Sequence, residues 1–127
     1  MTSLLDIELL RDLYPDPQAR CRFLRRAHDV LRADRQALQA AMARRDHGDA
    51  RQLAHRLQGT AAFLNGARES TLELFRALNQ ALAQGDVALL PGRCEPTLTY
   101  LSSLEAALLR ATEDRATTGR KKKEMTN

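Results

Sequence analysis

Apolar residues recur along most of this chain at spacings of three and four, which is the period of an amphipathic α-helix. The pattern predicts five helical segments, at residues 3–13, 17–45, 49–64, 67–83 and about 97–112. Short turns separate the last four segments, so each is expected to run antiparallel to the next. The sequence therefore predicts an all-α fold, an antiparallel up-and-down four-helix bundle with an additional short N-terminal helix.

Polar residues at the starts of these segments fit the usual helix N-caps. Ser3 and Asp6 have the spacing of a capping box, and Asp16 precedes a proline at the first helical position. Asp49 is placed to cap the segment that follows it, because an aspartate oxygen can accept from the free N–H groups of a first turn. We expect these three starts from local chemistry alone.

Glycine and proline predict the remaining boundaries. Gly66 and Gly85 follow the third and fourth segments, where a left-handed residue commonly ends a helix. Pro91 and Pro96 both precede the last apolar repeat, and a proline inside a helix removes a backbone hydrogen bond. We therefore expect the regular part of the last helix to begin after Pro96.

Composition supports one helical domain. The chain has 127 residues, of which 43% are apolar but only 4% are aromatic, so leucine and alanine must form the core. The apolar period stops near Glu113, and all three lysines lie beyond it. We predict a folded domain over 1–112 and a charged, disordered tail over 113–127.

Several classes of protein are disfavoured. The two cysteines, Cys21 and Cys94, are too few and too far apart for a disulfide framework or a zinc motif, and no metal site is expected. No uncharged run approaches the roughly 18 apolar residues of a membrane span, and the first residues lack the features of a secretory signal. We expect a cytoplasmic domain that makes no membrane contact.

Positive charge is concentrated in one part of the chain. Residues 18–56 contain ten arginines against four aspartates. Such a patch can attract nucleic acid, an acidic protein surface or a phosphoryl group. Because no aromatic residues are interleaved and no DNA-binding motif is present, we do not expect a nucleic-acid partner. Arg20 and His28 are expected to be solvated on this basic face.

One histidine stands out by its position. At about 100° per residue, Leu53, Leu57 and Leu64 share one stripe of the predicted 49–64 helix, and His55 falls on the opposite side. Its neighbours on that side include Gly59 and Ala62, which are small. A lone histidine is usually only a surface or core residue, but this one would be exposed where another protein could approach.

The surrounding residues resemble a known motif. Positions 54–59 read Ala-His-Arg-Leu-Gln-Gly, followed by small residues and then Gly66. This run is similar to the signature of histidine-containing phosphotransfer (HPt) domains, and the likeness in length and helix order extends over residues 3–112. The resemblance implies a phosphorelay intermediate: His55 accepts a phosphoryl group from a receiver-domain aspartate and passes it to the receiver domain of a response regulator.

The chemistry of imidazole suits that role. A free imidazole side chain titrates near pH 6.5, so about neutral pH a ring nitrogen can attack phosphorus without a strong base. Phosphoryl transfer depends mainly on alignment and charge stabilisation. The resemblance implies a carrier that is not an enzyme by itself and needs no cofactor, with Mg²⁺ supplied by the receiver domain.

The chain departs from the family pattern at one position. Gln58 stands where the family usually has lysine, and a glutamine donates hydrogen bonds without bringing charge. We hypothesise that Arg51 or Arg56 supplies the cation near the phosphoryl group. The departure also keeps an alternative open, a non-phosphorylated helical adaptor or inhibitor that binds a receiver or kinase domain.

Partner binding is expected on the same face. Gln52, Gly59 and Ala62 lie nearest to His55 on the predicted helix, and we expect them to dock the receiver domains of a hybrid sensor kinase and of a response regulator. A carrier must release each partner, so the contact should be small and transient. A face left clear for a partner favours a monomer.

Overall fold

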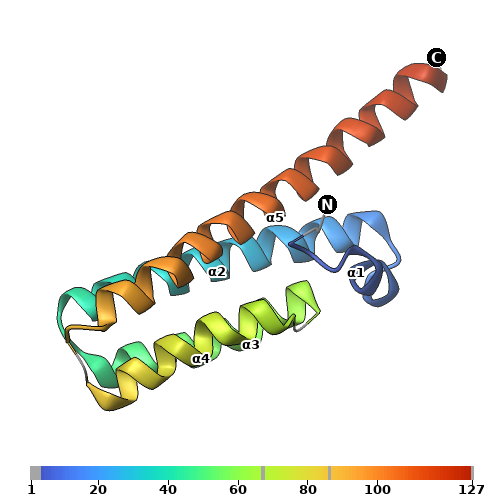
Figure 1. The fold of residues 1–127 in the computed structure, drawn as a ribbon. Helices are drawn as coiled ribbons and strands as arrows, with labels where there is room; N and C mark the ends of the chain where they lie inside the picture. Colours follow the sequence, from blue (N-terminus) through green and yellow to red (C-terminus); the bar gives the residue numbers. More distant parts are fainter. Residues whose placement is uncertain (1–3, 67, 86, 127) are drawn as a thin grey trace.

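The computed structural model describes the backbone of residues 4–66, 68–85 and 87–126, and the side chains of these residues as far as Glu113. Throughout this part the chain is helical, with five helices and no strand (Figure 1). None of the helices, over the residues described, is long and apolar enough to cross a membrane. The helices are α1 (Ile7–Leu13), α2 (Pro17–Ala43), α3 (His47–Asn65), α4 (Glu69–Gln84) and α5 (Leu90–Thr126).

The four long helices pack in a closed order. α2 contacts α3 and α5, and α4 contacts the same two helices from the other side. Figure 1 shows α1 at the end of the molecule where α2 begins. A backbone hydrogen bond of 2.8 Å from the Asp6 N–H to the Leu64 carbonyl ties the entry of α1 to the end of α3. The path of α3 is therefore held on both sides and at its C-terminal end.

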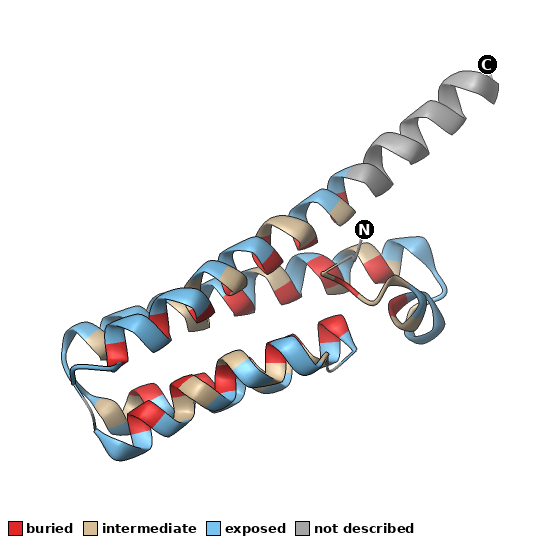
Figure 2. Cartoon of the chain, in the orientation of Figure 1, coloured by how far each residue is buried: buried red, intermediate tan, exposed pale blue. Residues whose placement is uncertain are grey.

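Leucine and alanine form the core, as the composition predicts. Buried positions face inward on all four long helices (Figure 2), and Phe75 is the one large aromatic side chain fully buried among the residues described. Leu13, the last residue of α1, is 48% exposed and lies outside this core. The predicted leucines of α3 are confirmed, and Ala54 and Ala61 beside them are completely buried. These small side chains let neighbouring helices approach α3 closely.

Three predicted boundaries are confirmed. The Asp16 carboxylate accepts from the backbone N–H groups of Gln18 and Ala19 at the start of α2. Gly66 and Gly85 follow α3 and α4 in the left-handed conformation, with φ of 78° and 66°. Only glycine adopts this conformation without steric cost, which is why it marks the helix end in the sequence.

The starts of α1 and α3 differ from the prediction. The N-cap of α1 is Asp6, whose carboxylate accepts from the Leu9 N–H, and Ser3 lies outside the described residues. The N-cap of α3 is Asp46, and Asp49 instead donates its backbone N–H to that carboxylate at 3.1 Å. Contacts outside each local motif decide both starts: Asp6 is held by α3, and the Asp46 N–H is bonded to the Ala41 carbonyl at the end of α2.

The start of α5 also differs from the prediction. The helix begins at Leu90 and includes Pro96, whereas we expected regular structure only after that proline. Pro91 lies in the first turn, where its missing N–H would have had no helical partner. Pro96 removes the bond to the carbonyl of Gly92, and both residues are exposed, so water can satisfy that carbonyl.

The predicted division at residue 112 stays a prediction. The backbone of α5 is described as far as Thr126, whereas the side chains of residues 114–127 lie outside the described residues.

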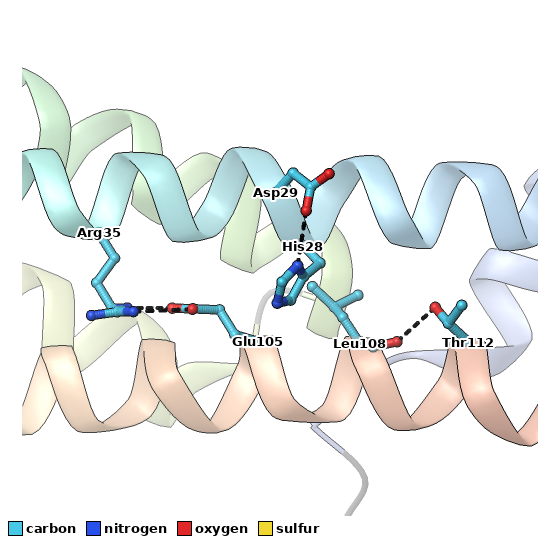
Figure 3. A network of polar contacts seen from close by, with 6 residues as sticks. All are labelled: His28, Asp29, Arg35, Glu105, Leu108 and Thr112. Atoms are coloured by element: carbon cyan, nitrogen blue, oxygen red, sulfur yellow. Dashed lines mark hydrogen bonds and ion pairs between the residues drawn. The ribbon is translucent and has the colours of Figure 1, made fainter.

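Two polar residues of the basic segment are less solvated than predicted. Arg20 is buried, and its guanidinium donates to the Tyr14 carbonyl at 2.8 Å. The His28 ring lies against α5 near Leu108, with Nδ1 at 3.1 Å from the Asp29 carboxylate (Figure 3). Both side chains lie where α2 meets another part of the fold, and the spacing of arginines along one helix cannot reveal such a contact.

Candidate functional site

The outward face of α3 carries His55. Its side chain is exposed, whereas Leu53, Leu57 and Leu64 are buried on the opposite side of the helix. The predicted orientation of this histidine is confirmed. Because buried leucines and alanines fix the rotation of α3 in the core, the imidazole is held outside by the packing of the rest of the helix.

His55 lies in a shallow hollow of about 600 Å³ between α3 and α4. The other lining residues are Gly48, Arg51 and Gln52 from the start of α3, and Asn79 from α4. Among the described residues, no hydrogen bond or ion pair engages the His55 ring. The hollow therefore places a solvent-accessible imidazole beside a cation and two side-chain amides, with room for a phosphoryl group.

The two candidate cations behave differently. Arg51 is exposed and lines the hollow with His55. Arg56 points to α2, where its Nε and Nη2 donate to the Asp34 carboxylate at 3.0 and 2.8 Å. These hydrogen bonds, and then the charge of Asp34, raise the pKa of Arg56. The structure thus brings Arg51 to the histidine and leaves Arg56 bound elsewhere.

Gln58 has a partner that sequence reasoning missed. The Asn79 side-chain N–H donates to the Gln58 Oε1 at 3.1 Å, across the interface between α4 and α3. Asn79 lines the hollow of His55 and also a second hollow that contains Gln58. No motif in the chain marks Asn79, because it belongs to a different helix and becomes a neighbour only when α3 and α4 pack.

The three predicted docking residues do not line one common pocket. Gln52 lines the hollow of His55, whereas Gly59 lines a groove of about 400 Å³ between α2 and α3. Ala62 is half-buried and lines neither space. Two exposed apolar side chains, Phe63 at 43% and Val30 at 45% exposure, flank Gly59 in that groove.

Aromatic contacts give the groove a defined wall. Phe23 stacks on Tyr14 with ring centroids 4.6 Å apart and meets Phe63 edge-on at 5.9 Å. Arg26 lines the same groove. Gly59, two aromatic rings and an arginine therefore lie together one helical turn from His55, on a face where the sequence predicted mostly small neighbours.

A larger cavity of about 920 Å³ lies elsewhere, between α2 and α5. Its lining includes His47, Cys94 and Arg35. Burial, and then the negative charge of Glu95, raises the pKa of the Cys94 thiol. A thiol held in its neutral form is a poor nucleophile, so size alone does not make this cavity the better candidate for chemistry.

In the described part of the chain, no group of three or more His, Cys, Asp or Glu side chains is arranged to hold a metal ion. Comparison of the chain with protein-family models, curated protein sequences and solved structures found no match.

Proposed function

We propose that this protein is a phosphorelay intermediate built as an HPt-like antiparallel four-helix bundle, with α1 as an additional helix. The observation that carries the proposal is the exposed, unengaged His55 ring in a hollow beside Arg51. The likeness of residues 54–59 to the HPt signature supports it, as does the packing of α2, α3, α4 and α5 around one core.

The transfer step needs only the imidazole and a phosphorylated partner. A lone pair on one ring nitrogen of neutral His55 attacks the phosphorus of an aspartyl phosphate on a receiver domain. The nitrogen–phosphorus bond forms as the bond between phosphorus and the aspartyl oxygen breaks, and the aspartate leaves with that electron pair. Reversal of the same step on a second receiver returns the ring to its starting state.

Arg51 is proposed to stabilise the phosphoryl group. It lines the hollow with His55, and its exposure lets the guanidinium reach a phosphoryl oxygen. Arginine suits this role because its N–H groups match the geometry of phosphate oxygens. Arg56 would have to give up two hydrogen bonds to Asp34 to do the same, which makes it the weaker candidate.

The receiver domain is proposed to dock on the groove beside Gly59. Phe63 and Val30 offer apolar area to a partner there, and Arg26 adds a charge that suits an acidic surface. A glycine inside a helix is less stable than alanine by roughly 0.5–1 kcal/mol. A Cβ at Gly59 would meet no atom within 4 Å, so the packing of the described chain does not require glycine.

Transfer between receiver domains tests the proposal. Receiver domains carrying radiolabelled aspartyl phosphate are mixed with the purified chain, and unlabelled receiver domains are added afterwards. The label should move to the wild-type chain and onward, and His55→Gln should abolish both steps. His47→Gln is the matched control, because His47 is at the start of the same helix but lines the other cavity.

Each outcome separates carrier from adaptor. Loss of labelling in His55→Gln with retention in His47→Gln supports the carrier. A receiver domain that binds the chain tightly but never labels it would overturn the proposal in favour of the adaptor or inhibitor. Arg51→Ala should lower the labelling rate more than Arg56→Ala does, and equal effects of the two would remove Arg51 from its proposed role.

A further inference from the structure

The contact between Asn79 and Gln58 fixes one end of a side-chain amide. Asn79 Nδ2 donates to Gln58 Oε1 at 3.1 Å, and both side chains are half-buried. The carbonyl end of Gln58 is therefore occupied by α4. Among the described residues, the Gln58 amide nitrogen makes no hydrogen bond, so its two N–H donors are left for something outside the chain.

Gln58 lies close to His55 along α3. Gln58 follows His55 by three residues, so the two side chains are neighbours on the surface of α3. Asn79 lines the His55 hollow and the Gln58 hollow alike, which places the bonded amide pair at the boundary between them. A phosphoryl group on His55 would occupy the hollow that Asn79 already borders.

We propose that Asn79 is a positioning residue for the phosphoryl site: it holds the Gln58 carbonyl so that the Gln58 amide N–H groups donate to phosphoryl oxygens on His55. This inference rests on the proposed function of His55. A glutamine amide can present its acceptor or its donors, and Asn79 selects the donors.

The rate of phosphorylation by a small donor tests this inference without a receiver domain. Phosphoramidate transfers its phosphoryl group to imidazole as its own nitrogen–phosphorus bond breaks and ammonia leaves. Asn79→Leu keeps the size of the side chain but cannot donate, and it should slow the labelling of His55 about fivefold, the size expected for one lost hydrogen bond. Gln84→Leu, which removes an exposed amide at the C-terminal end of α4 that lines neither hollow, should leave the rate unchanged.

A lysine background supplies the decisive comparison. In Gln58→Lys the lysine ammonium has no carbonyl for Asn79 to hold. Adding Asn79→Leu to that variant should therefore not lower the rate of His55 labelling any further. A general effect of Asn79→Leu on folding would appear in both backgrounds. A positioning role therefore predicts that the loss occurs with glutamine at 58 and disappears with lysine.

The outcomes distinguish this inference from the proposal beneath it. Failure of phosphoramidate to label His55 in the wild-type chain would contradict the proposed function itself. Labelling of the wild type with no change in Asn79→Leu, or with the same loss in both backgrounds, would overturn the role of Asn79 alone. A fivefold loss confined to the Gln58 background would support it.

Discussion

Polar side chains are arranged differently in two regions of the molecule, the interface between α2 and α5 and the outer face of α3. Between α2 and α5, Arg35 donates to both carboxylate oxygens of Glu105, and the pair is largely closed off from solvent (Figure 3). On α3, Arg51 and His55 stand exposed in a hollow. Arg35 and Glu105 are thus paired with each other, whereas Arg51 and His55 make no hydrogen bond or ion pair among the described residues.

This difference predicts which substitutions should change stability and which should change the proposed transfer. The hydrogen bond to Glu105, and then the charge of Glu105, raises the pKa of Arg35, although partial burial opposes the charged form. Removal of either Arg35 or Glu105 leaves the other side chain charged and without its ion-pair partner between α2 and α5. Removal of a side chain from the α3 face leaves no such group behind, so we expect its effect on transfer and not on the free energy of unfolding.

The largest loss of stability is expected from Glu105→Leu. It leaves the Arg35 guanidinium without its carboxylate, and breaking a buried ion pair of this kind costs about 3 kcal/mol. Urea unfolding measures the change. The double variant Arg35→Leu/Glu105→Leu should recover most of the loss, because no uncompensated charge remains, and failure to recover would show that the pair contributes more than its own charges.

Gly66→Ala should lower the free energy of unfolding by about 2 kcal/mol, because alanine is strained in a left-handed backbone and its Cβ would also clash with a neighbour. The added Cβ would lie 2.8 Å from the Asp6 carboxylate. Gly85→Ala is the matched control, because its φ is also positive but the space around it is open, so only about 1 kcal/mol should be lost. Equal losses in thermal unfolding would mean that the Asp6 contact is not restrictive.

Substitution of Gly59 should move stability and transfer in opposite directions. Gly59→Ala should stabilise the chain by up to about 1 kcal/mol, because alanine favours the helix and nothing obstructs its Cβ. Gly59→Leu should lower the rate of transfer from a receiver domain about tenfold, equivalent to ~1.4 kcal/mol of lost docking. Unimpaired transfer in Gly59→Leu would remove the groove from the docking surface.

The smallest expected effect is a gain from Arg45→Gly. Arg45 has a φ of 59° between α2 and α3, where its N–H bonds to the Met42 carbonyl and the next N–H bonds to the Ala41 carbonyl. Glycine is the usual residue at this left-handed position, so the substitution should stabilise the chain by about 0.5–1 kcal/mol. A loss of stability would mean that the arginine side chain itself supports the turn.

Local patterns predicted most of the helices, because helical period and left-handed glycines act within one segment. The N-caps Asp6 and Asp46, and the start of α5 at Leu90, were not predicted for the opposite reason. Each depends on a bond to another segment, or on water satisfying a carbonyl freed by proline, and neither is visible in the spacing of residues. The type of element was therefore more predictable than its boundary.

The candidate site divides in the same manner. The exposure of His55 could be predicted because it depends on the rotation of a single helix. The capture of Arg56 by Asp34 and of Gln58 by Asn79 could not, since both partners belong to other helices. The sequence thus predicted that His55 is exposed, but it left open which neighbouring side chains are available to it.

Whether His55 itself accepts the phosphoryl group is decided by the position of the label. The chain is treated with phosphoramidate, and intact mass and peptide mapping locate the modification. We expect one phosphoryl group on His55, stable in alkali, lost in acid and absent from His55→Gln. A wild-type chain that gains no phosphoryl group, or that gains the same group after His55→Gln, would contradict this expectation.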